Sequence, residues 1–527
     1  MLRRDTIRYA DSECIAFSPD AKNILLFTNQ SENNLVKEPT GASLTKWSLD
    51  SKQSLFRSAP DDGQCPINIY GSGELLEVDT EDGLNIYDGF NGHLLVQIYS
   101  FLSGDWAAVT PDGLFDGTPD GYSLLKWRFN GNTFDLAPVE IFLRDFYHPG
   151  LLAEIFSGRR PRPVAALTKQ DRRQPCIRMS EDEGVKPGIA RVTLRLKEAP
   201  SDALHEHGSG VRDVRLLRNG VLAKWWHGEI PLDASGSTTL VTDIPLAGGG
   251  NRLTAYAFNR DNVKSADASS YTYNSEQGRA GVAYVVAIGI DRYTADTPGR
   301  PINLRFAVAD ARDFGDAFSR VLKSGKEFKE VRLLTLFDDH AAEGDIRAVI
   351  RVLGGMPKVS LSPSQRETLH DVDAIGPDDG LFVFYAGHGA ADSSHFYFLP
   401  HDADPLVSPS DSASHAISDY ELSGLLEPIS ASRAFLIIDA CQSGKLLESD
   451  IPVGPINASG LAQLAFDKGM YILAAAQTRE AALETSELAN GHGYLTYALI
   501  DEALKQRRVS DDQQGLSLRS WFEYATR

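Results

Sequence analysis

The sequence has 527 residues, a formal net charge of −20 at pH 7 and a pI near 5.1. A chain of this length is too long for one hydrophobic core, so we expect roughly three or four domains. The acidic balance argues against a nucleic-acid partner, because contacts to phosphate groups require clustered lysine and arginine side chains.

The four cysteines, Cys14, Cys65, Cys176 and Cys441, lie far apart and form no C-x-x-C pair. This spacing predicts neither a disulfide framework nor a zinc site, and it favours a reducing compartment. The N-terminus begins basic but lacks the apolar segment of a secretory signal, and no run of about 18 apolar residues predicts a membrane span. We therefore expect a cytoplasmic protein with no membrane partner.

Residues 1–150 contain short apolar segments separated by turn residues, which is typical of β-structure. In AFSPDAKN and WAAVTPDGLFDG an apolar strand precedes a Pro-Asp turn, and this pattern resembles the blades of WD40-type propellers. Only two or three blades fit, whereas a closed propeller takes about four to eight. The alternatives are therefore a propeller-like region and a small antiparallel β module.

Residues 151–184 include the basic, proline-bearing stretch Ser157–Pro175, and we expect a linker there. Residues 185–277 contain apolar residues that alternate with polar ones, which predicts half-buried strands. Asn219-Gly220 between two such strands is a signal for a type I′ hairpin. A module of about 90–100 residues with this pattern predicts an Ig-like β-sandwich, whose simplest role is a spacer.

In residues 280–527, apolar strands alternate with helical patterns. The expected strands are AYVVAIGI, VRLLTLF, LFVFYAG, RAFLIIDA and MYILAAA, and the expected helices include LRFAVADARDFGDAFSRVL, GDIRAVIRVLGG and LTYALIDEALKQ. This alternation predicts a mostly parallel α/β sheet flanked by helices, with an active site beyond the carboxyl ends of its strands. The expected fold class is therefore multidomain: N-terminal all-β modules followed by a C-terminal α/β domain.

Two of these expected strands end in reactive side chains, because LFVFYAG leads to His388 and FLIIDA leads to Cys441. A neighbouring histidine helps a cysteine to form the thiolate, which is the nucleophilic species. The alternative is a buried, inert cysteine, as free cysteines usually are. Asp439 before Cys441, and the polar Gln442-Ser443-Gly444 after it, favour a reactive site.

FYAGHG and, about fifty residues later, IIDACQSG resemble the caspase and metacaspase cysteine peptidases of clan CD, peptidase C14 type, in the form found in bacterial caspase-like proteins. The resemblance implies a caspase-like peptidase domain over residues 280–527 and hydrolysis of peptide bonds by a Cys-His dyad. Cys441 would be the nucleophile and His388 the general acid/base. The backbone N–H groups of Gly389 and Cys441 would form the oxyanion hole.

The resemblance also implies a substrate pocket. Asp439 lies two residues before Cys441, on the same side of the strand, and Asp310 lies in AVADAR. Both match aspartates that line the S1 pocket of metacaspases. Two carboxylates favour arginine or lysine before the cleaved bond, so the expected partner is a protein with a basic cleavage site. The alternatives are a solvated helix residue for Asp310 and a structural acceptor or helix cap for Asp439.

The Gly-His-Gly tripeptide recurs at His492, in a polar loop before an expected helix. No apolar strand precedes this histidine, so we expect a turn residue rather than a catalytic one. His370, His395, His401 and His415 lie in polar stretches without metal-ligand spacing, and we expect surface or loop roles. No cofactor is expected, and although metacaspases are often calcium-dependent, no EF-hand loop occurs here.

The sequence is compatible with more than one route of activation and with a non-enzymatic role. Lys445 and the arginines between Arg159 and Arg173 are candidate self-cleavage sites, and a regulatory protein bound to the N-terminal β modules is another route to activation. The alternative to an enzyme is a catalytically silent scaffold or sensor that acts through those modules. A Rossmann-type nucleotide-binding protein is disfavoured, because no G-x-G-x-x-G follows the AYVVAIGI strand.

Overall fold

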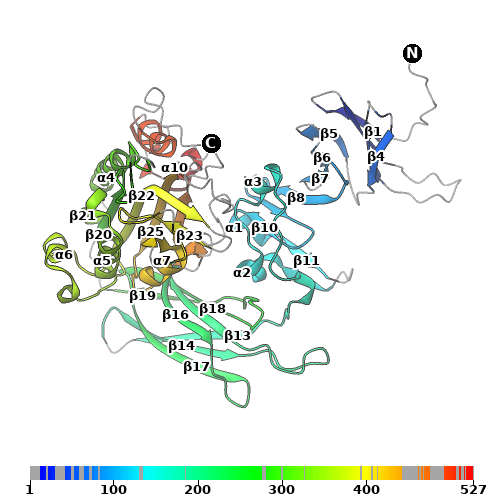
Figure 1. Ribbon diagram of the computed structural model, residues 1–527. Coiled ribbons are helices and arrows are strands. Elements are labelled where there is room, and N and C mark those ends of the chain that lie inside the picture. The colour runs from blue at the N-terminus through cyan, green and yellow to red at the C-terminus, as the bar shows by residue number, and fades with distance from the viewer. Residues whose placement is uncertain are drawn as a thin grey trace. The chain divides into compact units, whose positions relative to one another are not determined.

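A computed structural model of the chain, shown in Figure 1, describes residues 12–18, 22–29, 42–48, 51, 53–58, 64–70, 74–80, 83–129, 134–183, 186–275, 281–297, 301–325, 327–391, 395–404, 407–411, 414–441, 461, 464–466, 468–474, 492–505, 510–511, 515–516 and 518–525. The chain forms two compact units. The first holds residues up to 172 together with 261–264, and the second holds 173–260 and the residues from 265 onward. Among the described residues, no helix combines the length and apolar character needed to cross a bilayer.

The first unit contains two antiparallel meanders. The four-stranded sheet consists of β1 (Ser12–Phe17), β2 (Asn23–Asn29), β3 (Ala42–Ser48) and β4 (Gln53–Ser58). The six-stranded sheet consists of β5 (Gln64–Tyr70), β6 (Leu75–Asp79), β7 (Gly83–Asp88), β8 (Leu94–Ser100), β9 (Trp106–Val109) and β10 (Phe115–Gly117). Successive strands pair with their sequence neighbours, as expected for short apolar segments joined by tight turns.

The two Thr-Pro-Asp-Gly segments of this unit have different structures. Thr110 accepts the amide of Leu114 at 3.1 Å in a turn where Gly113 has a φ of +105°, so this segment joins β9 to β10. Thr118 instead accepts the amide of Gly121 at 3.2 Å and caps α1 (Pro119–Ser123). The sequence repeat therefore does not mark a structural repeat.

The region predicted to be a linker, residues 151–184, contains regular structure. It begins with α3 (Leu151–Phe156), whose Leu151 and Ile155 are buried in a core shared with the six-stranded sheet, and it ends with β13 (Cys176–Glu183). The remaining elements of the first unit are β11 (Lys126–Arg128), β12 (Leu136–Pro138), α2 (Leu143–Phe146) and two single-turn 3₁₀ helices, Val139–Phe142 and Leu167–Lys169.

The second unit begins with a β-sandwich. One sheet has the order β13, β14 (Ile189–Lys197), β17 (Ser237–Pro245), and the other has β16 (Val221–Glu229), β15 (Arg212–Arg218), β18 (Gly249–Phe258), β19 (Ala268–Asn274). Alternate residues of β14, including Val192 and Leu194, are fully buried between the sheets. Asn219 and Gly220 have φ values of +51° and +85°, which confirms the predicted type I′ hairpin.

The C-terminal sheet of the second unit has seven strands. They are β20 (Gly281–Gly289), β21 (Phe328–Phe337), β22 (Gly380–Ala391), β23 (Phe396–Phe398), β24 (Ile417–Ser418), β25 (Arg433–Cys441) and β26 (Tyr471–Ala474). β20 pairs parallel with β21 and β22, and β25 pairs parallel with β22 and β26. β23 and β24 extend the sheet in the antiparallel direction.

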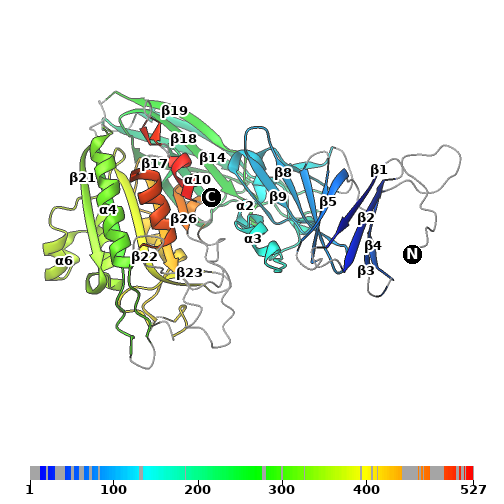
Figure 2. The ribbon, with the colours of Figure 1, turned by 90° about the horizontal axis from the view of Figure 1, so that it is seen from above.

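The helices of this region are α4 (Ala307–Ser324), α5 (Glu343–Leu353), α6 (Pro363–Thr368), α7 (Asp419–Leu426), α9 (Tyr494–Thr496) with its π-helical continuation η6 (Tyr497–Lys505), and α10 (Leu518–Ala525). Short elements complete it: Asp338–His340, Lys358–Ser360, β27 (Ser510–Asp511) and β28 (Gly515–Leu516). In Figure 2, α4 and the red helices near the C-terminus stand next to one another. Their contact includes the stacked rings of Phe314 and Trp521, whose centroids are 6.2 Å apart.

The proportions and directions of the strands correct the fold class predicted from the sequence. In the part of the chain that the structure describes, strands hold more residues than helices do, and most of the sheets are antiparallel. The C-terminal sheet is mixed, so it is not the clear, mostly parallel sheet flanked by helices that was predicted. The prediction was wrong because it missed β23 and β24, which are too short to show an apolar period and pair antiparallel. The chain is a predominantly β protein with several antiparallel sheets.

A buried arginine joins the sandwich to the C-terminal sheet within the second unit. The Arg218 side chain is 1% exposed, and its guanidinium donates to the carbonyls of Pro245 and Ser430, each at 2.8 Å. It also donates to Ser430 Oγ at 3.0 Å. Ser430 lies shortly before β25, so the sandwich fixes the start of the strand that leads to Cys441. A simple spacer would not require this contact.

Candidate active site at the ends of β22 and β25

The two strands that carry the predicted catalytic residues are direct neighbours. β22 and β25 pair in parallel, with Cα partners running from Gly380 and Arg433 to His388 and Cys441. Neighbouring strands lie about 4.8 Å apart. The structure therefore brings the backbones of His388 and Cys441 to the same end of the sheet, whereas the Cys441 side chain lies outside the described residues.

The His388 ring is held in one orientation. Its Nε2 lies 2.6 Å from the carbonyl oxygen of Ile302, and the ring centroid lies 4.7 Å from that of Tyr293. A carbonyl only accepts, so Nε2 carries the hydrogen and Nδ1 is the basic nitrogen. The side chain is 2% exposed, so this tautomer is fixed by a buried contact. No sequence pattern indicates the role of Ile302.

Two buried tyrosines hold the backbone of His388. The amide of His388 donates to Tyr293 Oη at 2.7 Å, and its carbonyl accepts the Tyr385 hydroxyl at 2.7 Å. Burial raises the pKa of both tyrosines above the ordinary value, so both phenols stay protonated at neutral pH. These contacts fix the position from which the imidazole projects.

Close packing accounts for the two glycines that flank His388. A Cβ at Gly387 would lie 3.0 Å from the hydroxyls of Tyr293 and Tyr385, and a Cβ at Gly389 would lie 2.7 Å from the ring of Phe396. Any larger residue would therefore displace an aromatic side chain that supports the histidine. Gly389 lies opposite Phe398 in the antiparallel pairing of β22 with β23, and its oxyanion role stays a prediction.

The predicted pocket residues Asp310 and Asp439 meet, although they come from α4 and β25. Asp439 is 7% exposed and its Oδ2 accepts the Thr496 hydroxyl at 2.7 Å. Burial, followed by the nearby charge of Asp310, raises the pKa of Asp439 to about 6. Asp310 is 4% exposed, and burial raises its pKa although hydrogen bonds from His492 and Gly493 oppose the shift.

His492 lies at the centre of this acidic cluster, which differs from the turn role expected from the sequence. Its Nδ1 lies 2.7 Å from Asp310 Oδ1, and its Nε2 lies 3.3 Å from Asp313 Oδ2 and 3.8 Å from Asp501 Oδ2. The hydrogen bond to Asp310, more than any other contact, raises the pKa of His492. The side chain is buried, so the second Gly-His-Gly motif also holds a positioned histidine.

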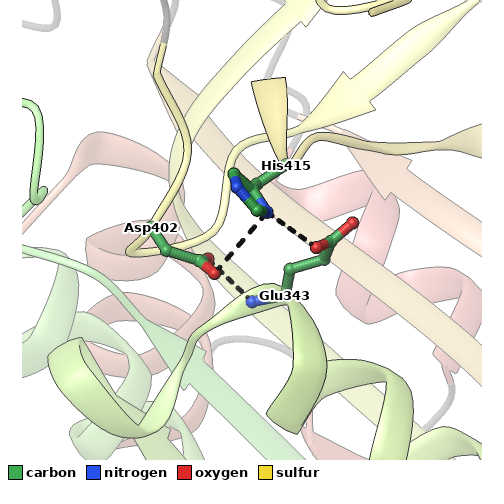
Figure 3. Close-up of side chains that lie close together, drawn as sticks. All are labelled: Glu343, Asp402 and His415. Carbon is green, nitrogen blue, oxygen red and sulfur yellow. Dashed lines mark hydrogen bonds and ion pairs between the residues drawn. The ribbon is translucent and has the colours of Figure 1, made fainter. Parts of the chain in front are cut away.

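Among the described residues, one group of three side chains could hold a metal ion, and Figure 3 shows it. Ligand atoms of Glu343, Asp402 and His415 lie within 4.8 Å of one another. Their polar atoms already bind each other: Asp402 accepts the amide of Glu343 at 2.8 Å, and His415 Nδ1 lies 2.9 Å from Glu343 Oε2. Arg347 pairs with the other Glu343 oxygen. These contacts describe a capped N-terminus of α5 with a histidine–carboxylate pair.

The other histidines singled out in the sequence have structural partners. His395 Nδ1 lies 2.8 Å from Asp419 Oδ1, His401 Nδ1 lies 2.6 Å from the carbonyl of Arg292, and His370 is exposed beside Asp371.

Comparisons with known proteins leave the family open. No protein-family model and no curated protein matches the sequence. Fibronectin(III)-like modules of CbhA from Clostridium thermocellum are 12% identical, with a TM-score of 0.14 over 50% of this chain and 90% of that one. BamB from Moraxella catarrhalis is 8% identical, with a TM-score of 0.14 over 49% and 76%. A carbohydrate acetylesterase from Xanthomonas citri is 8% identical, with a TM-score of 0.20 over 60% and 72%. Likeness at this level carries no argument about function.

Proposed function

We propose that the protein is a cysteine endopeptidase of the caspase-like type, which cleaves peptide bonds after arginine or lysine with Cys441 and His388. The observation that carries the proposal is the register of β22 and β25, which makes these two residues Cα partners at the same end of neighbouring strands. The carbonyl of Ile302 supports it further, because a catalytic base is commonly oriented by a third group.

The reaction follows from the tautomer of His388. Nδ1 accepts the thiol proton of Cys441, and the thiolate attacks the carbonyl carbon of the peptide bond. The imidazolium then gives this proton to the leaving amine as the C–N bond breaks, which leaves an acyl-thioester on Cys441. Water, deprotonated by His388, hydrolyses the thioester and releases the acid. Ile302 keeps the ring in place through both halves of the reaction, and no cofactor is required.

The basic specificity is supported by the convergence of two carboxylates near the nucleophile. Asp439 lies two residues before Cys441 in β25, and Asp310 is close enough for its charge to raise the pKa of Asp439. Paired carboxylates bind a guanidinium through two parallel hydrogen bonds, which favours arginine. The expected partner is a protein with an exposed basic cleavage site.

The alternative function is a catalytically silent scaffold or sensor, and the burial of the site favours it. His388 is 2% exposed and Asp310 is 4% exposed, so neither offers much surface to a substrate. The same burial fits an enzyme that awaits an activating step, such as self-cleavage or a partner bound to the N-terminal β modules. The candidate cleavage site Lys445 lies outside the described residues, whereas Arg160 and Arg172 pair with Asp88 and Asp135.

Fluorogenic peptides with arginine, lysine or aspartate at the cleavage position test the proposal, with and without calcium. We expect turnover of the arginine and lysine peptides, and a loss of at least ~10³-fold in kcat/KM in Cys441→Ala and in His388→Ala. Cys176→Ala is the matched control, because Cys176 is an exposed free cysteine far from β25 in the sequence, and its activity should be unchanged. Cleavage after aspartate alone, or full activity of Cys441→Ala, would contradict the proposal.

A further inference from the structure

The acidic pair Asp310–Asp439 is covered by a segment from the far end of the chain. Residues His492–Thr496 include α9 (Tyr494–Thr496), and donors of this segment bind both carboxylates. His492 Nδ1 and the Gly493 amide contact Asp310 at 2.7 and 3.1 Å, and the Thr496 hydroxyl donates to Asp439 at 2.7 Å. An imidazole, a backbone amide and a hydroxyl thus already bind carboxylate oxygens that a guanidinium would otherwise bind.

The segment lies directly against both carboxylates. A Cβ at Gly493 would lie 3.0 Å from Asp439 Oδ2 and 3.3 Å from Asp310 Oδ2. Asp310 and Asp439 are 4% and 7% exposed, and Thr496 is fully buried. Even a methyl group would not fit between Gly493 and the two carboxylates without displacing them, so no second cation fits there either. The segment and a basic ligand therefore compete for the same carboxylates.

The charges around His492 make the site attractive to a cation. Asp310 and Asp313 face the imidazole from α4, Asp501 faces it from η6, and the charge of Asp439 acts from β25. Among the described residues, Lys505 offsets part of this charge, because it binds Asp501 at 2.7 Å on the exposed side. If the imidazole leaves, the remaining field favours any basic side chain that can enter.

We propose that His492–Thr496 is a built-in occupant of the site for a basic side chain, and that a substrate arginine or lysine must displace His492 before cleavage. The inference rests on the proposed function, and it assigns to the second Gly-His-Gly motif a role in regulating access. His492 is a competitor for the pocket and takes no part in the chemistry of Cys441.

The imidazole makes this occupancy dependent on pH. The hydrogen bond to Asp310 raises the pKa of His492, so the charged form persists above the ordinary range and holds the acids. As the pH rises through that raised pKa, the imidazole becomes neutral and binds Asp310 and Asp313 less strongly. Ionisation of Asp439 strengthens the acidic field as the pH rises through its pKa of about 6. Access for a basic ligand should therefore increase with pH.

Binding of benzamidinium to the full chain tests the inference without catalysis. In a Cys441→Ala background, calorimetric titration at pH 7 should give at least ~10-fold tighter binding with His492→Ala than with His492. Asp310→Asn should abolish binding, and His415→Ala, at a histidine–carboxylate pair elsewhere, should leave it unchanged. Equal affinity of the His492 and His492→Ala proteins would overturn the inference.

A second variant, His492→Gln, tests whether a change in affinity comes from the charge of His492 and not from a loss of structure. His492→Gln keeps one donor for Asp310 but carries no charge, so its affinity for benzamidinium should lie between the other two and should rise less with pH between about 6 and 8. In the active protein, His492→Gln should lower KM for arginine peptides and leave kcat nearly unchanged. Stronger benzamidinium binding without any peptide cleavage would refute the peptidase but support the occupied site. Peptide cleavage with the same benzamidinium affinity in the His492 variants would support the peptidase and refute the occupied site.

Discussion

Asp439 is the residue whose ionisation should affect stability most visibly. Burial raises its pKa to about 6, against an ordinary value near 4 in the unfolded chain. A carboxyl with a raised pKa binds a proton more tightly in the folded state. Its contribution to stability is therefore fully present below about pH 4 and is lost as the pH rises through about 6.

The isosteric substitution Asp439→Asn removes this titration and keeps an oxygen for the Thr496 hydroxyl. We expect the variant to gain thermal stability relative to the wild type as the pH rises from about 4 to about 7, because only the wild type then buries a charge. Thermal unfolding across this range measures the difference in Tm. A difference that does not change with pH would show that Asp439 does not titrate as described.

Sequence patterns predict some of the site residues but not those whose contacts depend on the tertiary fold. His388, Cys441 and Asp439 are visible because each lies at or near the end of an apolar strand, and strand ends in register are neighbours. His492 contacts Asp310 across 182 residues of sequence, and the Ile302 carbonyl has no side-chain signal at all. Contacts of these two kinds depend on tertiary proximity, which a single sequence does not encode locally.

Among the elements, the hairpin of β15 and β16 has an effect beyond its own sheet. Arg218 ends β15, and its guanidinium binds three carbonyls and a hydroxyl in a buried position. Arg218→Ala removes the buried donors that Arg218 supplies to these acceptors, and we expect it to destabilise the second unit by about 3 kcal/mol or more. Urea unfolding followed by tryptophan fluorescence and circular dichroism provides the measurement.

Arg191→Ala is the matched control for Arg218→Ala. Arg191 also binds a partner of the sandwich, Asp243, at 2.8 Å, but both side chains are more than 40% exposed. Pairs of this kind contribute about 0–1 kcal/mol, so this variant should unfold almost as the wild type does. Similar midpoints for the two arginine variants would show that the Arg218 contact does not hold the sandwich to the sheet.

The elements also show where sequence patterns suffice and where they fail. AYVVAIGI and LFVFYAG are confirmed as strands β20 and β22, and the helical spacing around Phe314 is confirmed as α4. Long apolar segments give such signals because burial determines their composition. β23, with three residues, and β24, with two, are too short to have a period, and their antiparallel pairing makes the sheet mixed.

For the whole molecule, the division into two compact units predicts the course of thermal unfolding. The first unit includes residues 261–264, whose Asn262 side chain donates to Asp145 at 3.0 Å and whose Lys264 amide donates to the Ile141 carbonyl at 2.8 Å. Each unit has its own hydrophobic clusters, so they should unfold at different temperatures. Scanning calorimetry should give a calorimetric enthalpy larger than the van't Hoff enthalpy. A single two-state transition would contradict the division.

The Arg218 contact also limits how such a chain can be assembled from others. A recombination event in residues 276–280 would separate the sandwich from the sheet and pair one of them with a foreign neighbour. A foreign domain in place of the sandwich would then need an arginine, or an equivalent set of donors, facing the carbonyl of Ser430. Without such donors, the residues before β25 would lose the hydrogen bonds that Arg218 provides. Lineages that carry this sheet should therefore inherit the sandwich with it, whatever precedes residue 173.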